Sequence, residues 1–321
     1  MSIDLLCADS ALCSIPGKLA LAVVFYLTLP RILAVLPQQP QFIAKYLTFI
    51  IGALTMSAVG CVIAIVCTLT DKRHLINKLA TGMFSKFVAG PCGITFNVKG
   101  EERLKTVPPA IVVCNHQSNI DLIIVGRLYP TYCSIMAKKE LIYVPVLGLF
   151  MKLANVIFID RKNHKKALES TANAVAEMKK HHSGMWIFPE GTRSHFDKPN
   201  LLPFKKGAFH LAIQSHLPIL PIVVEGYGHI YSSRRRAFPG GEIKIRILEP
   251  IPTKGLTIED VDSLMERTRS VMMKHLKEMD QSSRTDVPVV QSKEEKKPIE
   301  AALDKETEDV SYESVKKRPR I

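Results

Sequence analysis

The sequence predicts an α/β protein, a central mixed sheet flanked by helices, preceded by an N-terminal membrane helical hairpin. Between about residues 76 and 280, short apolar runs alternate with longer amphipathic ones. Before them, Tyr46–Thr70 holds 25 residues without a charged side chain. After them, residues 281–321 are polar, charged and poor in aromatics, which is typical of a disordered tail. We therefore divide the chain into membrane-anchoring helices at 1–75, a globular domain at 76–280 and a charged tail at 281–321.

The first expected elements are the two arms of the hairpin. At about 1.5 Å per residue, Tyr46–Thr70 exceeds the roughly 30 Å of a hydrocarbon core, and a buried core helix is the alternative. Leu19–Leu36 is interrupted by Pro30 and Arg31, so it predicts a tilted span or a helix lying in the membrane interface. Acidic residues precede this run, which argues against a cleaved signal peptide. Basic residues follow the second run and place the later chain on the cytosolic side.

The globular domain is expected to contain five strands and three helices. Four short apolar runs predict buried strands, at Ile111–Cys114, Val156–Ile159, Met185–Phe188 and Ile219–Val224. Strict alternation predicts a strand with one solvated face at Glu242–Ile247. Amphipathic segments predict helices at Lys162–Lys180, Gly207–Ser215 and Ile258–Met279.

The positive charge of the chain lies in this same middle region. Of the net charge of +13, residues 71–280 supply +12, from 31 basic and 19 acidic side chains. Such a domain is attracted to phosphate-rich surfaces. Nucleic acid and anionic lipid both fit that charge, but the apolar N-terminus favours membrane lipids and argues against nucleic acid. The seven cysteines include no Cys-x-x-Cys pair and predict free thiols, with neither disulfides nor a metal site.

A histidine and an aspartate follow the strand Ile111–Cys114. His116 would stand at the carboxyl edge of the sheet, and Asp121 would stand one helical turn into a helix starting near Ser118. An aspartate on one ring nitrogen fixes the histidine tautomer, and the other nitrogen can then take a proton from a hydroxyl. Alternatively, Ser118-x-x-Asp121 is only a capping box. The spacing is weak by itself, since it recurs at His275 and Asp280 on a predicted polar helix.

Cationic loops follow two other predicted strands. In Phe188–Ser194, Gly191 permits a close backbone approach, Thr192 can donate a hydrogen bond, and Arg193 offers a planar fork suited to phosphate. Arg161 stands two residues after the end of the strand Val156–Ile159. Because ligands bind at the carboxyl edge of open α/β sheets, these loops favour a shared phosphate site over separate solvated charges.

Further basic residues have more than one interpretation. Lys205 and Lys206 precede a predicted helix, whose N-terminus also favours anions. Lys138 and Lys139 can face coenzyme A phosphates or only solvent. Arg234–Arg236 predicts a membrane-surface patch or a solvated loop. No Gly-x-Ser-x-Gly segment surrounds Ser118, so a nucleophilic serine has little support.

Taken together, these segments resemble the 1-acylglycerol-3-phosphate acyltransferases of animal type, which are lysophosphatidic acid acyltransferases. The resemblance runs from about Leu75 to Met279, and its strength lies in the order and spacing of the blocks. The matching blocks are Asn115–Asp121, Val156–Arg161, Phe188–Ser194 and Leu217–Val223, with Lys138–Leu141 and Pro203–Phe209 between them. One departure is Asn155, where members of the family often have glycine.

The resemblance implies the glycerolipid acyltransferase fold and a direct acyl transfer from acyl-CoA to the free hydroxyl of lysophosphatidic acid, without an acyl-enzyme. His116 would be the general base oriented by Asp121. Arg161 and Arg193 would hold the phosphate in a pocket that Glu190, Gly191 and Thr192 shape. No metal or bound cofactor is implied, since acyl-CoA is a co-substrate. The expected location is the endoplasmic reticulum membrane, with the catalytic domain facing the cytosol.

Three other functions remain open from the sequence. The acceptor could be glycerol 3-phosphate or another lysophospholipid. A non-catalytic lipid-binding protein on the same scaffold would lack the histidine or the aspartate, and both are present. A thioesterase or lipase would use water as the acceptor and release free fatty acid.

Overall fold

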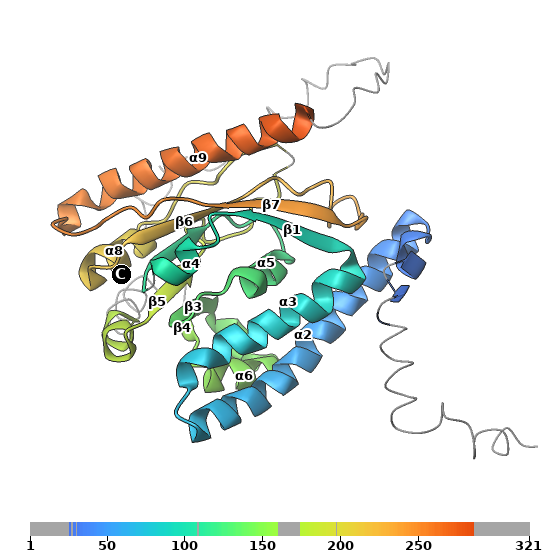
Figure 1. The fold of residues 1–321 in the computed structure, drawn as a ribbon, viewed down its shortest axis with the longest axis horizontal. Coiled ribbons are helices and arrows are strands. Elements are labelled where there is room, and N and C mark those ends of the chain that lie inside the picture. Colours follow the sequence, from blue (N-terminus) through green and yellow to red (C-terminus); the bar gives the residue numbers. More distant parts are fainter. Residues whose placement is uncertain are drawn as a thin grey trace, which may run out of the picture. The chain divides into compact units, whose positions relative to one another are not determined.

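The computed structural model describes residues 26, 28–29, 31–107, 109–159, 174–196 and 198–285, without the side chains of 159 and 282–285 (Figure 1). Its compact unit extends as far as Ser283. A seven-stranded sheet forms the centre, in the order β1-β7-β6-β2-β5-β3-β4. Neighbouring strands are parallel except for the pair β6 and β7, so the predicted mixed sheet is confirmed. The strands are β1 Ile94–Lys99, β2 Ile111–Cys114, β3 Cys133–Lys138, β4 Ile157–Ile159, β5 Gly184–Ile187, β6 Ile219–Val224 and β7 Gly241–Ile247.

The five predicted strands are present, and two strands were missed. β2 and β6 have the predicted bounds, β4 and β7 differ from them by one residue at the start, and β5 is shifted by one residue at both ends. β1 and β3 escaped prediction because neither is a continuous apolar run: Asn97 and Lys99 face outward in β1, and β3 is only partly buried along most of its length. Each becomes a strand by pairing with a neighbour that is distant in the chain, β1 with β7 and β3 with β5.

Helices cover both faces of the sheet. The predicted helix Gly207–Ser215 is confirmed as α8, and the one expected from Ile258 begins as a short 3-10 turn whose Thr257 and Asp260 form a capping box. The long helix then continues to Thr285, five residues into the predicted tail. Of Lys162–Lys180, only residues 174–180 are described, and they are helical. The other helices are α2 Gln38–Leu69, η2 Arg73–Leu75, α3 Ile76–Cys92, α4 Arg103–Thr106, α5 Asp121–Leu128, η3 Lys139–Tyr143, α6 Leu147–Leu153, η4 Ile258–Asp260 and α9 Val261–Thr285.

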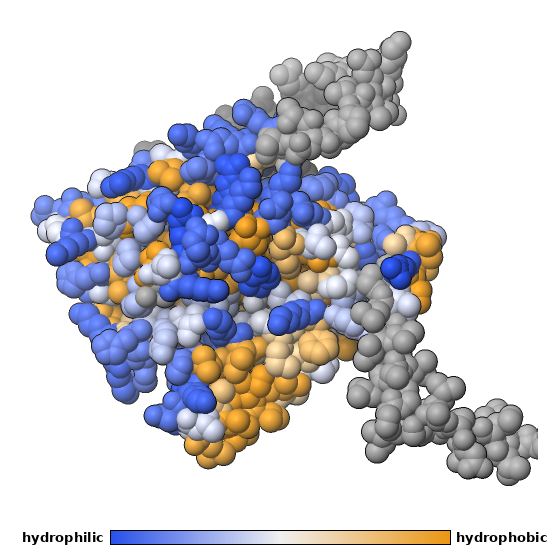
Figure 2. Space-filling view, viewed as in Figure 1, coloured by the Kyte–Doolittle hydropathy of each residue, from blue (hydrophilic) through white to orange (hydrophobic). Residues whose placement is uncertain are grey.

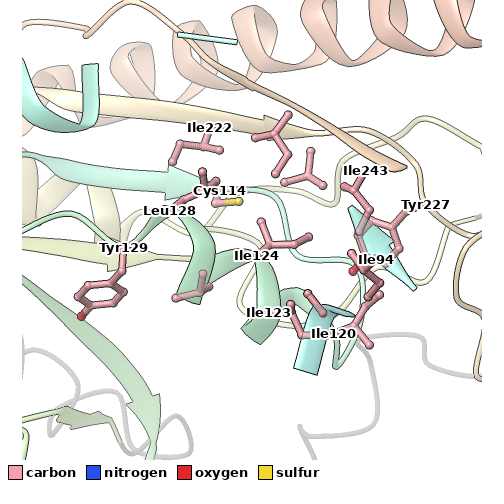
Figure 3. Packing of buried hydrophobic residues seen from close by; sticks show 14 of the residues in the cluster. Ile94, Cys114, Ile120, Ile123, Ile124, Leu128, Tyr129, Ile222, Tyr227 and Ile243 are labelled. Carbon is pink, nitrogen blue, oxygen red and sulfur yellow. The ribbon is translucent and has the colours of Figure 1, made fainter. Parts of the chain in front are cut away.

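Two cores lie on opposite faces of β2 because successive side chains of a strand alternate. Val112 and Cys114 join the core beneath α2, α3 and α5, whereas Ile111 and Val113 join the core beneath α8 and α9. Figure 3 shows the first of these cores, in which the isoleucines at 120, 123 and 124 pack beside Cys114. Full burial of each isoleucine stabilises the fold by about 1.5–3 kcal/mol. The start of α5 is therefore fixed against the end of β2, where the candidate active site lies.

Two backbone positions of the fold depend on particular residues. Gly126 in α5 lies so close to α3 that a Cβ atom would be 2.1 Å from the Thr81 carbonyl oxygen. Asn155, which precedes β4, has a φ of 52°. Asparagine tolerates this left-handed conformation better than most residues, so it suits this position.

The N-terminal helix α2 combines an apolar exterior with firm attachment to the rest of the protein. Within the described residues it is the helix long and apolar enough to cross a membrane. It packs along α3, across the boundary predicted near residue 75, and its buried Lys45 Nζ donates a hydrogen bond to the Pro239 carbonyl at 2.7 Å. Half of Leu19–Leu36 lies outside the described residues. The exposed apolar residues of α2 are Ile43, Leu47, Ile50, Ile51, Leu54, Val62, Ile65, Val66 and Leu69.

The apolar exterior of α2 continues onto neighbouring helices. Figure 2 shows a hydrophobic area where Figure 1 draws α6 and the adjoining ends of α2 and α3. Leu149 on α6 and Leu79 on α3 are exposed in the same way. The cysteines that the structure describes, at 61, 67, 92, 114 and 133, are free thiols.

Candidate active site

The loop between β2 and α5 is held by side-chain amides that extend the sheet. Asn115 accepts a hydrogen bond from the Val224 N–H at 2.9 Å and donates one to the Val224 carbonyl at 3.0 Å. Gln117 donates to the carbonyls of Val224 and Glu225 at 3.1 and 2.8 Å. These bonds replace the backbone ladder where β2 ends, so the loop leaves the sheet in one fixed direction.

His116 and Asp121 form the predicted pair. His116 Nδ1 lies 2.6 Å from Asp121 Oδ2, at the first residue of α5. The backbone N–H groups of Gln117 and Ser118 donate to the same carboxylate oxygen at 2.7 and 3.0 Å, and the buried Tyr227 hydroxyl donates to Oδ1. Because an ionised carboxylate only accepts hydrogen bonds, Nδ1 carries the proton of the ring. Among the described residues, Nε2 has no hydrogen-bond partner and remains for a substrate.

Only one of the two hydrogen bonds of the predicted capping box at Ser118 and Asp121 is present. Its carboxylate accepts the Ser118 N–H, as in a capping box, but the Ser118 hydroxyl accepts the Ile120 N–H at 3.2 Å and contacts Tyr227 at 3.0 Å. One aspartate therefore both caps the loop and orients His116. The duplicate spacing in α9 differs, because His275 Nδ1 lies 3.2 Å from Glu278.

The ring of His116 is fixed on a second side by the segment after β5. It stacks on Phe188 with ring centroids 4.1 Å apart and an interplanar angle of 18°. The His116 backbone N–H donates to Glu190 Oε1 at 2.7 Å, and the Leu202 N–H donates to Glu190 Oε2 at 2.9 Å. Burial raises the pKa of the Glu190 carboxyl, and these two hydrogen bonds oppose that shift. Glu190, predicted as part of the phosphate pocket, thus joins three loop segments and directs both oxygens at backbone N–H groups.

The cationic loop after Glu190 is tied to the loop that carries His116. The Ser194 N–H donates to the His116 carbonyl at 2.9 Å, and the His195 N–H donates to the Gln117 carbonyl at 3.3 Å. Gly191 has a φ of 69°, and a Cβ atom there would lie 2.8 Å from Lys205 Cε. This segment therefore follows the His116 loop closely, while the side chains of Thr192 and Arg193 face solvent.

Thr192 and Arg193 in this loop are exposed beside the pair. Arg193 has no carboxylate partner in the described part of the chain. Its positive charge therefore acts on the neighbouring side chains. The pKa of His195 is lowered, first by partial burial and then by the charges of Arg193 and Arg234. The charges of Arg193 and Arg234 therefore both act on this corner of the His116 loop.

The other basic residues predicted to bind anions lie at varying positions. Lys205 covers Gly191, whereas Lys206 forms an exposed ion pair with Asp262 of α9 at 2.8 Å. Lys138 ends β3 at the same sheet edge and pairs with Glu140 at 3.3 Å, and the exposed Lys139 begins η3. Arg161 lies outside the described residues.

Sequence reasoning missed two contributors to the site. Tyr227 bonds Asp121 and Ser118 from the loop after β6, and Phe188 stacks on His116. Both follow buried strands that end at this edge, so the rule that selected Arg193 also applied to them. Their role in the site was not predicted, because an aromatic residue next to an apolar run is usually part of a core.

The arrangement belongs to a known class of enzymes. The Acyltransferase family model matches residues 95–225, which run from β1 to the end of β6 and include the loops of the site. The chain is 37% identical over 74% of its length to the 1-acyl-sn-glycerol-3-phosphate acyltransferase of Saccharomyces cerevisiae, of which 80% is covered. With the beta form of Homo sapiens the identity is 34%, covering 77% of this chain and 87% of the relative. The chain belongs to the 1-acyl-sn-glycerol-3-phosphate acyltransferase family, and it is an acyltransferase.

A solved structure has the same fold. The crystal structure of the 1-acyl-sn-glycerophosphate (LPA) acyltransferase PlsC from Thermotoga maritima superposes with a TM-score of 0.62. The two sequences are 24% identical, and the match covers 74% of this chain and 95% of that one. The mixed sheet with flanking helices is therefore the acyltransferase fold that the sequence predicted.

Proposed function

We propose that the protein transfers a fatty acyl group from acyl-CoA to the free hydroxyl of lysophosphatidic acid, giving phosphatidic acid and CoA. The observation that carries this proposal is the His116–Asp121 pair, 2.6 Å apart, hydrogen-bonded through its own loop to a cationic segment. The pair suits activation of a hydroxyl, and Arg193 suits an acceptor that bears a phosphate. Relatives named for 1-acyl-sn-glycerol-3-phosphate support this acceptor.

In the proposed reaction, the acceptor hydroxyl donates a hydrogen bond to His116 Nε2. Its oxygen attacks the thioester carbonyl as its proton passes to the ring, and Asp121 stabilises the imidazolium that forms. The tetrahedral intermediate then expels the CoA thiolate, which takes the proton back from His116. The new ester bond replaces the thioester bond, and the enzyme returns to its starting state without an acyl-enzyme.

The residues proposed for binding surround this pair. Arg193 would hold the acceptor phosphate, with Gly191 and Thr192 forming the adjacent backbone, and Arg161 is the second arginine expected there. Lys138, Lys139 and Lys205 remain candidates for CoA phosphates. The chemistry needs no metal and no bound cofactor, because a carboxylate-supported histidine supplies the base.

The apolar exterior of α2, α3 and α6 supports binding to membrane lipids, from which a lysolipid acceptor can reach the site. We propose an endoplasmic reticulum membrane location with the catalytic domain on the cytosolic side. Reconstituted protein whose His116 loop is protected from externally added protease would contradict the proposed orientation.

The test of this function is an acceptor comparison with the purified full chain in detergent micelles. With oleoyl-CoA as donor, we expect phosphatidic acid from lysophosphatidic acid and much slower acylation of lysophosphatidylcholine or glycerol 3-phosphate. Equal turnover of lysophosphatidylcholine would contradict the acceptor, and release of free fatty acid alone would indicate a thioesterase.

The variant His116→Ala tests the general base. We expect turnover to fall about 10²–10⁴-fold while the circular dichroism spectrum is unchanged. His275→Ala, the matched control from the chance duplicate in α9, should keep normal turnover. Near-normal activity in His116→Ala would end the assignment of His116 as the base.

A further inference from the structure

The three consecutive arginines at 234–236 have three different surroundings. Arg235 is used by its own loop, because its guanidinium donates to the Gly228 carbonyl at 2.6 Å. Arg236 is exposed and has a φ of 47°. Arg234 instead lines a small cavity beside the His116 loop. The predicted membrane-surface patch is therefore not a uniform one.

This cavity is built from the loops after β2, β5 and β6. Its volume is about 30 Å³, close to the share of one water molecule in the liquid. An oxygen of a phosphate fits such a space, whereas an acyl chain does not. The lining residues are Gln117, Ser118, His195, Phe196, Tyr227, Gly228, Tyr231, Ser232, Ser233 and Arg234.

The electrostatics of this corner favour an anion. Neither Arg193 nor Arg234 has a carboxylate partner within the described residues. Both charges lower the pKa of His195, which lines the cavity, and Arg193 opposes the rise in the pKa of Tyr231 that burial causes. Arg234 at the wall of a hydroxyl-lined cavity, with the charge of Arg193 acting on His195 of the same wall, is a suitable setting for a doubly charged phosphate.

We propose that Arg234 is a specificity-determining residue that binds the phosphomonoester of the acceptor together with Arg193, with Ser232 and Ser233 at the cavity wall. This inference rests on the proposed function and adds a binding group from the loop after β6. The phosphate would sit beside Ser118 and Gln117, next to the catalytic pair. Arg234 would thereby select phosphorylated acceptors over neutral ones.

The experiment compares Arg234→Gln with Arg236→Gln, a control that removes the same charge two residues away and outside the cavity. In detergent micelles, we expect Arg234→Gln to raise the KM for lysophosphatidic acid about 10- to 100-fold. Its KM for acyl-CoA and its kcat/KM for monoacylglycerol, which has no phosphate, should not change. Inorganic phosphate should compete with lysophosphatidic acid in the wild type and less well in Arg234→Gln.

The other outcomes separate the sources of phosphate. A change in the acyl-CoA KM alone would assign Arg234 to coenzyme A and overturn the proposal. Equal KM values for the two glutamine variants would overturn it too. Arg234→Lys, which keeps the charge but loses the fork, should give an intermediate KM and serves if the glutamine variant is unstable.

A double-mutant cycle tests whether the two arginines share one phosphate. The combined Arg193→Gln and Arg234→Gln variant should then have a KM that differs from the product of the single effects. A wild type that fails to acylate lysophosphatidic acid would reject the proposed function itself. In another outcome, the wild type prefers lysophosphatidic acid to monoacylglycerol and Arg234→Gln keeps the same preference. That result would reject only the role of Arg234.

Discussion

The loops after β2 and β5 leave the same edge of the sheet but are held in different ways. In the first, Asp121 accepts hydrogen bonds from His116, Tyr227 and two backbone N–H groups, and it is buried. In the second, only the backbone and Glu190 are fixed, whereas Arg193 is exposed and has no ion-pair partner among the described residues.

This difference matches the tasks that we propose for the two loops. A general base must stand within hydrogen-bond distance of one proton, so its orientation has to exist before the substrate arrives. A phosphate clamp can instead adjust its long side chains when the anion binds, because charge attracts over a range of several ångströms. Changes to the buried side chains that hold His116 should therefore alter kcat and stability, and changes to the exposed Thr192 and Arg193 should alter KM.

The largest effect is expected for Asp121→Asn. Its amide oxygen can still accept from His116, but the negative charge that stabilises the imidazolium is lost. We expect kcat to fall about 10²–10³-fold at almost unchanged KM, measured by steady-state kinetics. Asp280→Asn, at the chance duplicate, is the matched control and should be indistinguishable from the wild type. A change confined to KM would show that Asp121 only caps its helix.

Glu190→Gln should have a smaller effect with two components. An amide has one acceptor oxygen, so either the His116 or the Leu202 N–H stays unpaired, which costs about 1–3 kcal/mol of stability. Because the His116 loop then shifts, we also expect kcat to fall about tenfold.

A variant of the buried Glu225 separates the loss of stability from the loss of kcat. Glu225 follows β6, and its carboxylate accepts the Lys244 N–H at 2.7 Å. In chemical denaturation, Glu225→Gln should lose stability without the same loss of kcat. Full activity in Glu190→Gln would show that its bond to His116 does not align the base.

The smallest effect concerns the pH dependence of stability through His195. Its pKa in the folded protein lies below the ordinary value of 6.5, by burial first and then by Arg193, Arg234 and His116, with Asp121 opposing. The folded state thus binds the proton less tightly than the unfolded state, so stability is full above pH 6.5 and declines as pH falls from 6.5 toward the lowered pKa. Thermal unfolding should show a steeper decline there in the wild type than in His195→Gln. If the stability of the two proteins fell equally with pH, the result would contradict the lowered pKa of His195.

Much of the fold was predictable because its signals are local. β2 and β6 are short runs of buried apolar residues, and α8 is one amphipathic segment, so each had its bounds correctly predicted. β1 and β3 were not predictable in this way, since their strand character depends on partners 147 and 51 residues away, as in the pairs Ile94 with Gly241 and Cys133 with Gly184.

By itself, the sequence determined the order of the blocks, the presence of His116, Asp121 and Arg193 after apolar strands, and an uncharged run long enough for a membrane. Only the tertiary structure decided how these residues are used. Tyr227 meets Asp121 across 106 residues, and Glu190 meets the His116 N–H across 74. Such contacts follow from the strand order of the sheet, which places the ends of β2, β5 and β6 side by side. For the same reason, three adjacent arginines acquired three different environments, and only Arg234 lines the cavity beside the catalytic pair.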